Sequence, residues 1–366
     1  MGFESFLGNA EAVAAVRGML ASGRVPGALL FVGPDGVGKK TLALMLAKAL
    51  ICERHAQRPD DFCGECARCR RAEEMLAAAQ EDLARRRDSK DAQKRVEGLL
   101  YFDLQLIEPI SRYILIEQIR QLRNVAYTRP FEFPQRVFII DQAQAIHWQA
   151  IDLLLKVLEE PPETTTFILV CSNPYELRPT IRSRCLLIQF APVEESVIAA
   201  LLAKESRLTK AQRILAARVA AGSVARAESF DPDDFERRRR LWLDFLEGVA
   251  GGSAVPLDTF NWKPVFDSAK ALTENRSDLE ETLKMGCSLL RDLLQVVETG
   301  ADGEVVHVDL LARLKSWATK LGFTGIERLK LGLDQAYRLQ TRNVNPQLGL
   351  ETLATELVAG WRPGSS

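Results

Sequence analysis

A glycine-rich segment near the N-terminus has the spacing of residues that bind phosphate. An apolar run at 28–32 precedes Gly33, Gly38 and Lys39, which satisfy the pattern G-x-x-x-x-G-K, and an apolar-periodic stretch follows to Leu50. A strand, turn and helix of this kind leave successive backbone N–H groups pointing into one concavity, where the helix dipole also favours an anion. The predicted phosphate-binding residues are Gly33, Gly36, Gly38, Lys39, Lys40 and Thr41.

This loop departs from the usual pattern at the position that normally holds magnesium. Lys40 stands where a Ser or Thr hydroxyl is expected. Thr41 comes one residue later, which on a helix is a rotation of about 100°, so its hydroxyl cannot simply substitute. A glycine turn that only packs a strand against a helix is the alternative. We predict a P-loop without a working Mg²⁺ site, and we leave ATP binding open.

Residues 136–141, Arg-Val-Phe-Ile-Ile-Asp, predict a buried parallel strand that ends in the carboxylate of Asp141. Beside a P-loop, an aspartate at the carboxyl edge of a parallel sheet normally orients Mg²⁺ or its water ligands. The next residue in hydrolysing P-loop proteins is a glutamate, but here it is Gln142, whose amide cannot accept a proton as a carboxylate does. We therefore predict very slow or absent hydrolysis. Ser172 and Asn173 follow another apolar run and are expected to face the same site, with strand-end capping as the alternative.

Four of the seven cysteines lie close together in the sequence, at Cys52, Cys63, Cys66 and Cys69. The C-x₂-C spacing places two sulfurs on one turn, and two further thiolates complete the tetrahedral set that Zn²⁺ prefers. Four sulfur ligands leave no open coordination position, so we predict one structural zinc ion. Reduced buried cysteines or redox-active cysteines are the alternative.

Composition limits the class of protein. The 366 residues are enough for two or three domains, and 47% apolar with 27% charged residues is typical of a globular protein with sizeable cores. The sequence has neither the pattern of a signal peptide nor a window of about 20 apolar residues. A net charge of −1 argues against an autonomous nucleic-acid binder. We expect a cytoplasmic protein with no membrane partner.

The alternation of apolar runs with helical patterns across 28–190 predicts an α/β fold with a parallel sheet covered by helices. Residues 70–98 are charged and alanine-rich, which indicates a solvated helix or a partly ordered insertion. We expect the three arginines at 85–87 to face solvent rather than nucleic acid. Residues 191–235 have the pattern of a small helical lid, and 236–366 that of an all-α domain.

Several of these segments together resemble one family, the bacterial clamp-loader subunits of DNA polymerase III, and most of all their delta prime branch. The segments are residues 33–41, the four cysteines, 137–144, Leu-Glu-Glu-Pro-Pro at 158–162, Ser-Arg-Cys at 183–185 and 343–348. The resemblance implies an AAA+ domain at 1–190 with an inserted zinc module at 52–69, followed by the lid and a helical collar for oligomerisation. It also implies a hetero-pentameric ring with gamma/tau and delta subunits, which loads the sliding clamp onto primer-template DNA in the replisome.

The same resemblance implies roles for individual residues. Arg184 of the Ser-Arg-Cys motif is expected to reach the ATP of a neighbouring subunit as a trans arginine finger, which stabilises transition-state charge. Ser172 or Asn173 matches the first nucleotide sensor, and Arg226 the second. Lys40 and Gln142 separate the chain from the gamma and tau motors.

We therefore expect a largely non-hydrolysing stator within the DNA polymerase III holoenzyme, a nucleotidyltransferase complex. An active gamma/tau-type ATPase is the main alternative, and a stand-alone P-loop enzyme such as a small-molecule kinase is a weaker one.

Overall fold

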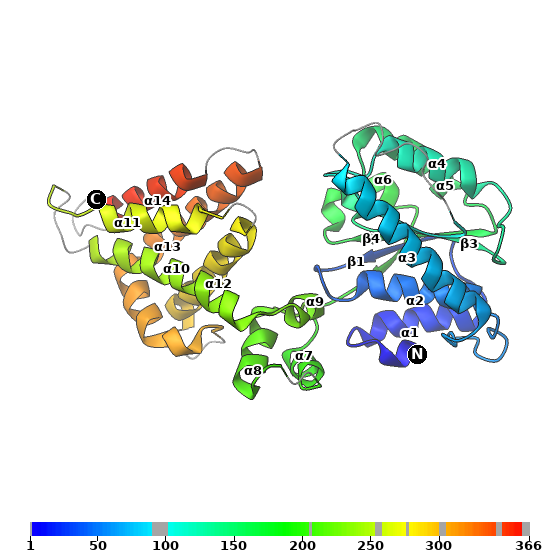
Figure 1. The fold of residues 1–366 in the computed structure, drawn as a ribbon, viewed down its shortest axis with the longest axis horizontal. Helices are drawn as coiled ribbons and strands as arrows, with labels where there is room; N and C mark the ends of the chain where they lie inside the picture. Colours follow the sequence, from blue (N-terminus) through cyan, green and yellow to red (C-terminus); the bar gives the residue numbers. More distant parts are fainter. Residues whose placement is uncertain are drawn as a thin grey trace. The chain divides into compact units, whose positions relative to one another are not determined.

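The computed structural model describes residues 2–89, 102–204, 207–252, 258–275, 278–299, 305–341 and 346–360. The chain divides into two compact units, Met1–Glu228 and Ser229–Ser366 (Figure 1). Residues 90–98 of the charged insertion and residues 343–345 of the resemblance lie outside the described residues. The finer division into three domains stays a prediction.

The first unit contains a five-stranded sheet in the order β2-β3-β4-β1-β5, and all its strand pairs are parallel. The strands are β1 (Ala28–Val32), β2 (Leu104–Ile107), β3 (Arg136–Ile140), β4 (Thr165–Cys171) and β5 (Leu186–Gln189). The predicted parallel sheet is confirmed. Because the strands are parallel, the residues that follow them meet at one edge of the sheet.

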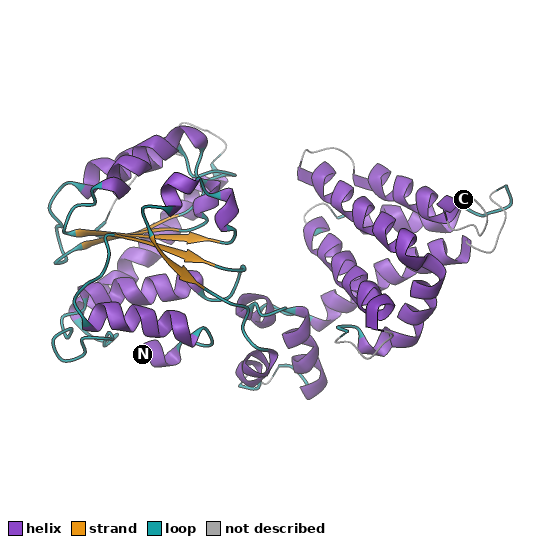
Figure 2. Ribbon diagram, turned by 180° about the vertical axis from the view of Figure 1, so that it is seen from behind, coloured by secondary structure: helices purple, strands orange, loops and turns teal. Residues whose placement is uncertain are grey.

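Helices cover both faces of this sheet (Figure 2). The two cores lie against α1 (Ala10–Ala21), α2 (Lys39–Ile51) and α3 (Ala67–Asp88) on one face, and against α4 (Ile116–Ala126) and α5 (Ile151–Glu159) on the other. Alternate strand residues supply the two cores: Leu29 and Phe31 pack on the first face, Leu30 and Val32 on the second. The apolar runs are continuous because both faces are buried.

Short elements complete this unit and lead away from the sheet. They are η1 (Phe3–Ser5), η2 (Ala143–Ala145), η3 (Trp148–Ala150), η4 (Pro174–Glu176), α6 (Pro179–Arg182), α7 (Glu195–Leu202), α8 (Lys210–Val219) and α9 (Val224–Glu228). Helices α7 to α9 occupy most of the predicted lid. The peptide N–H of Ala225, on α9, donates a hydrogen bond to Gly36 O at 3.3 Å, which ties this helix to the P-loop.

Much of the charged insertion is helical, since α3 extends to Asp88. The expectation that residues 85–87 all face solvent is wrong for Arg86, which is 9% exposed and donates a hydrogen bond to Asp82 at 2.6 Å. Arg87 is exposed, as predicted, and its Nη2 donates a hydrogen bond to Pro109 O at 2.9 Å. The Arg87 contact ties the end of α3 to the loop that follows β2.

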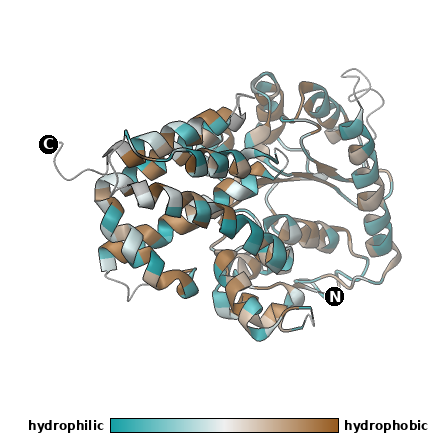
Figure 3. Ribbon diagram, turned by 60° about the vertical axis from the view of Figure 1, so that its left-hand side comes forward, coloured by the Kyte–Doolittle hydropathy of each residue, from teal (hydrophilic) through white to brown (hydrophobic). Residues whose placement is uncertain are grey.

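The second unit is helical, as predicted. Its elements are α10 (Pro232–Gly252), α11 (Lys263–Thr273), α12 (Leu279–Thr299), η5 (Val308–Leu310), α13 (Leu311–Thr341) and α14 (Pro346–Gly360). Hydrophobic and hydrophilic residues alternate along these helices (Figure 3), as in helices that bury one face. Trp242 is buried and donates from Nε1 to Thr282 O at 2.6 Å. None of the described helices is long and apolar enough to span a bilayer.

Candidate nucleotide site and candidate metal centre

The P-loop backbone takes conformations that favour glycine. Gly36 and Gly38 have φ angles of 76° and 95°, in the left-handed region. At Gly36 a side chain is also excluded by contact, because a Cβ there would lie 2.0 Å from Ser223 Oγ. The glycines at these two positions therefore set the shape of the loop.

A cavity of about 540 Å³ lies beside this loop, at the carboxyl edge of the sheet. Its lining includes seven predicted residues, namely Gly36, Gly38, Lys39, Lys40, Thr41, Asp141 and Ser172. The lining residues do not include Gly33, Asn173 or Arg226. Asn173 instead caps η4, its Oδ1 accepting a hydrogen bond from Tyr175 N–H at 3.0 Å. Of the two candidates for a first sensor, Ser172 is thus the one at the cavity.

Lys39 is held by the loop that contains it. Its Nζ donates hydrogen bonds to Gly33 O at 2.6 Å and to Pro34 O at 2.5 Å, and Asp35 Oδ1 lies 3.9 Å away. Burial lowers the pKa of this amine, although Asp35 and Asp141 oppose the shift. A phosphate entering the loop has to compete with the two carbonyls for this ammonium group.

Lys40 makes a different set of contacts. Its ammonium group donates a hydrogen bond to Glu108 Oε1 and lies 3.5 Å from Asp141 Oδ2. Glu108 follows β2 and Asp141 follows β3, and these strands are neighbours in the sheet. Arg87 Nη2 lies 3.6 Å from the other carboxylate oxygen of Glu108. One lysine therefore bridges two carboxylates beside the phosphate-binding loop.

Glu108 was not predicted as a site residue. The signal was present, because it is an acidic residue directly after an apolar run, as Asp141 is. Burial raises the pKa of Asp141, the ammonium of Lys40 opposes that rise, and the charge of Glu108 adds to it. The positive charge of Lys40 thus partly offsets two carboxylates at a partly buried edge of the sheet.

The segment after Asp141 offers amides rather than carboxylates. Gln142 adopts a φ of 54°, and its N–H donates to Asp141 Oδ1 at 2.9 Å. Gln144 Nε2 donates to Ser172 Oγ at 3.0 Å, which joins the ends of β3 and β4. Both glutamines line the cavity. Neither can act as a general base for an attacking water.

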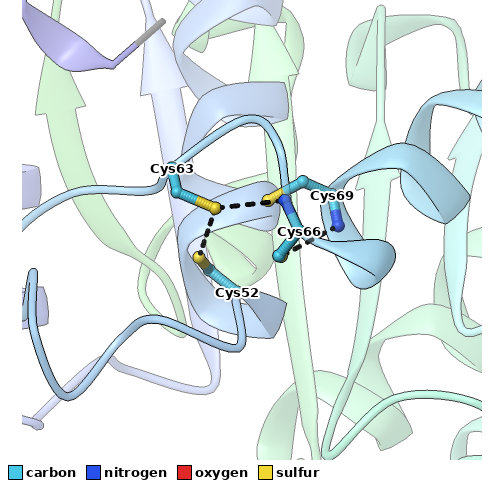
Figure 4. A group of neighbouring side chains, drawn as sticks. All are labelled: Cys52, Cys63, Cys66 and Cys69. Carbon is cyan, nitrogen blue, oxygen red and sulfur yellow. Dashed lines mark hydrogen bonds between the residues drawn. The ribbon is translucent and has the colours of Figure 1, made fainter.

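The four predicted cysteines come together at the other end of helix α2 (Figure 4). Cys52 directly follows α2, and Cys66 caps α3, on which Cys69 lies. All four are buried, and their sulfur atoms lie within 4.8 Å of one another. Sulfurs bound to one tetrahedral zinc at 2.3 Å would be separated by about 3.8 Å. The separation of 3.6 Å between Cys52 Sγ and Cys63 Sγ fits this arrangement.

Backbone N–H groups support negative charge on this cluster. Cys66 N–H donates to Cys63 Sγ at 3.3 Å, and Cys69 N–H donates to Cys66 Sγ at 3.4 Å. Burial opposes ionisation of Cys63, but the N–H groups of Glu65 and Cys66 outweigh it and lower its thiol pKa to about 6. Burial raises the pKa of Cys52 and Cys69. The donor set suits a closed site for a thiophilic cation.

Arg184 lies away from the cavity of its own chain. Its Nη2 donates to Glu159 Oε1 at 2.6 Å and its Nη1 to Thr180 O at 2.9 Å. The side chain is 32% exposed.

Comparisons with known proteins agree with this arrangement. A family model described as DNA polymerase III, delta subunit, matches residues 8–194, just over half of the chain. The chain belongs to this family. The match begins just before α1 and ends after β5, and it includes the P-loop and all four clustered cysteines.

Individual relatives extend the similarity. The chain is 27% identical to the DNA polymerase III subunit delta' of Bacillus subtilis, over 92% of each chain. It is 29% identical to the DNA polymerase III subunit gamma of Buchnera aphidicola, over 54% of this chain and 47% of that one. A solved DNA polymerase III gamma subunit-related protein from Thermotoga maritima aligns with 95% of this chain and 99% of its own at 13% identity, with a TM-score of 0.44.

Proposed function

We propose that this chain is a delta prime-type subunit of a bacterial clamp loader. In this role it joins gamma/tau and delta subunits in a five-membered ring that loads a sliding clamp onto primed DNA. Its AAA+ domain at 1–190 and lid at 191–235 join the ring, and its collar at 236–366 holds the subunits together. Family membership and the similarity to a delta' subunit along nearly the whole chain support this assignment.

The contact of Lys40 with Glu108 and Asp141 carries the further proposal that the subunit is largely non-hydrolysing. A P-loop enzyme uses a hydroxyl at this position, with an acidic residue on the adjacent strand, to hold Mg²⁺ on the nucleotide phosphates. Here a tethered ammonium already pairs with both carboxylates. Gln142 adds a second obstacle, because it cannot take a proton from water. If ATP binds, we expect its affinity not to depend on Mg²⁺ and the bound ATP to remain unhydrolysed.

Arg184 is proposed to serve a neighbouring subunit. Its distance from the cavity of its own chain, together with its partial exposure, suits a guanidinium that acts in trans. Its partners Glu159 and Thr180 hold it in the free chain, and a nucleotide phosphate on the neighbour would replace Glu159 as the anion.

The test of the non-hydrolysing role is equilibrium binding of ATP to the purified chain with and without Mg²⁺, together with steady-state hydrolysis. We expect no turnover, and an affinity that Mg²⁺ does not change. Binding that requires Mg²⁺, accompanied by turnover, would instead establish the gamma/tau-type motor.

The trans role is tested in a loader assembled with gamma/tau and delta subunits. Arg184→Ala should lower turnover at the adjacent ATP site by about 10³, because transition-state charge there loses its guanidinium. Assembly, followed by gel filtration, should be unchanged. Arg178→Ala is the matched control, since Arg178 is an exposed arginine on the same segment. DNA-stimulated hydrolysis equal in the two variants would refute the finger role.

A further inference from the structure

Two residues of the cysteine module at 52–69 pack against the segment 2–9. Asp61 Oδ1 accepts hydrogen bonds from the N–H groups of Phe3 at 3.0 Å and Phe62 at 2.8 Å. The rings of Phe3 and Phe62 meet edge to face, with their centroids 5.7 Å apart. Both rings are buried. The cysteine module thus holds residue 3 through a backbone hydrogen bond and a ring contact.

This contact is close, and it excludes water. A Cβ on Gly2 would overlap Asp61 Oδ2, so the backbone there lies directly against the carboxylate. Among residues 53–62, all of which the structure describes, only Asp61 and Phe62 are buried. A buried carboxylate is costly unless its oxygens accept hydrogen bonds, and two N–H groups supply them here. Burial of this pair therefore depends on the segment 2–9, and the pair in turn holds that segment.

The other end of the segment is held as well. Asn9 Nδ2 donates to Ala191 O at 3.1 Å, and Asn9 Oδ1 accepts from Ala191 N–H at 2.7 Å. Ala191 lies just after β5, so the two bonds fasten residue 9 to the chain that leaves the sheet. The segment is therefore fixed near both of its ends.

Between these two ends, Phe6 lies against the P-loop. A Cβ on Gly38 would lie 2.7 Å from Phe6 Cζ, so the ring packs directly on this glycine. Gly38 caps α2 and precedes Lys39, whose amine is held inside the loop. A displacement of Phe6 would therefore remove a support of the P-loop at the point where α2 begins.

We propose that Asp61 and Phe62 are positioning residues for the P-loop. They hold the segment 2–9, and the segment keeps Phe6 packed on the loop. A loop that is already ordered does not have to be ordered by a phosphate when the phosphate binds. The cysteine module in this way preorganises the phosphate-binding loop.

This role links the cysteine cluster to the P-loop. Phe62 directly precedes Cys63, so loss of a metal ion from the four sulfurs loosens the residues that hold the segment. Helix α2 also joins the two sites, because it begins at Lys39 and ends just before Cys52. The two connections can be separated by experiment, since a substitution at Asp61 leaves the cysteines and α2 unchanged.

The experiment measures hydrogen exchange of the full-length chain by mass spectrometry, in peptides that cover residues 33–41. Asp61→Ala removes the acceptor of the Phe3 N–H, so exchange of the P-loop amides should become about tenfold faster. Asp61→Asn keeps a side-chain oxygen that can accept this bond and should retain most of the protection. Removing the metal ion from the wild type with a zinc chelator should speed exchange as Asp61→Ala does, and should add little in that variant.

Phe6→Ala tests the other end of the same connection, at a residue far from the cysteines in the sequence. It should speed exchange of the P-loop amides to a similar extent while the zinc content stays that of the wild type. Glu65→Ala is the matched control, because Glu65 is an exposed carboxylate between Cys63 and Cys66. Exchange at 33–41 in this control should equal that of the wild type.

The proposal is overturned if Asp61→Ala and Phe6→Ala both exchange at 33–41 like the control. It is also overturned if only Asp61→Ala speeds exchange there, since the effect would then not pass through Phe6. Equal acceleration in β3 would overturn it as well, because the two residues would then only stabilise the domain as a whole. Exchange is measured without ATP and without a partner subunit, so any of these results leaves the proposed function untouched.

Discussion

The two ends of helix α2 differ in the partners of their charged and ionisable side chains. At the N-terminal end, Lys39 donates to backbone carbonyls, and Lys40 pairs with Glu108 and Asp141. At the C-terminal end, the interactions of the four sulfurs among the described residues are with one another and with backbone N–H groups. The first site is neutralised by the chain itself. The second brings together four thiols that could hold a metal ion.

Helix α3 joins the same two sites. Its N-terminal turn holds Cys66 and Cys69, and Arg87 near its C-terminus contacts Glu108 and Pro109. A P-loop and a cysteine cluster in one domain therefore do not imply two metal ions. We therefore expect one metal site, at the cysteines, and at the P-loop a lysine in place of the metal.

The largest expected effect is at the cysteine end. Cys69→Ser removes one of four ligands, and the chain should lose its zinc, about one ion per chain, together with several kcal/mol of stability. For a unit of this size the melting temperature should fall by about 10 °C or more. Zinc content and thermal unfolding are the measurements. Cys287→Ser, at an exposed cysteine outside the cluster, is the control. A metal-free wild-type protein that remains fully folded would show that the cysteines pack as thiols instead.

A smaller but more specific effect is expected at the P-loop end. Lys40→Thr removes the ammonium that lies between Glu108 and Asp141 and leaves Glu108 only its longer contact with Arg87, so ATP should bind at least about tenfold more tightly when Mg²⁺ is present. Lys40→Arg keeps a positive charge and should remain indifferent to Mg²⁺. Titration with a fluorescent ATP analogue distinguishes the variants. If the ATP affinity of Lys40→Thr does not change with Mg²⁺, Lys40 does not occupy the position of a metal ion.

Gln142→Glu separates the two obstacles to hydrolysis. It restores a carboxylate next to Asp141 but leaves Lys40 in place, so on its own it should give no steady-state turnover. Turnover at the rate of a gamma-type motor from this single change would show that Lys40 does not obstruct Mg²⁺.

The smallest effect concerns stability and pH. Folding raises the pKa of Asp141, so at neutral pH its ionised carboxylate lowers the free energy of unfolding. This destabilisation disappears as the pH falls through the pKa of Asp141 in the folded chain, because the carboxyl group is then protonated in both states. Asp141→Asn should therefore be at least as stable as the wild type at pH 7, within about 1 kcal/mol, with the difference vanishing near pH 4. Urea unfolding at both pH values measures it. A less stable variant at pH 7 would mean that the pairing with Lys40 outweighs the cost of burial.

Much of the N-terminal fold followed from local patterns. The runs at 28–32, 104–107 and 136–141, which are mainly apolar, predicted strands with bounds correct to within one residue, because a strand buried on both faces needs a largely apolar sequence. The clustering of Cys52, Cys63, Cys66 and Cys69 was also predicted from a local pattern, because their spacing in the sequence fits the ligands of one metal ion. The glycines of the P-loop were identified because a fixed backbone shape demands them.

Other features depended on distant residues and escaped prediction. Arg86 lies in a run of charges that looks solvated, yet the packing of α3 buries it. Glu108 becomes a site residue because β2 pairs with β3, which brings it near Asp141 and within reach of Lys40. Ser172 and Asn173 were equivalent by sequence, and the formation of η4 placed only the serine at the cavity.

The sequence by itself determined the kinds of group in this protein: a phosphate-binding turn, a lysine in place of a hydroxyl, a glutamine in place of a catalytic acid, and four thiols. Residue type and short spacing suffice for such features because the chemistry is local. Only the tertiary structure decided the partners of those groups. Which carboxylates meet Lys40 depends on the pairing of strands far apart in the chain, because β2 and β3 bring Glu108 and Asp141 together.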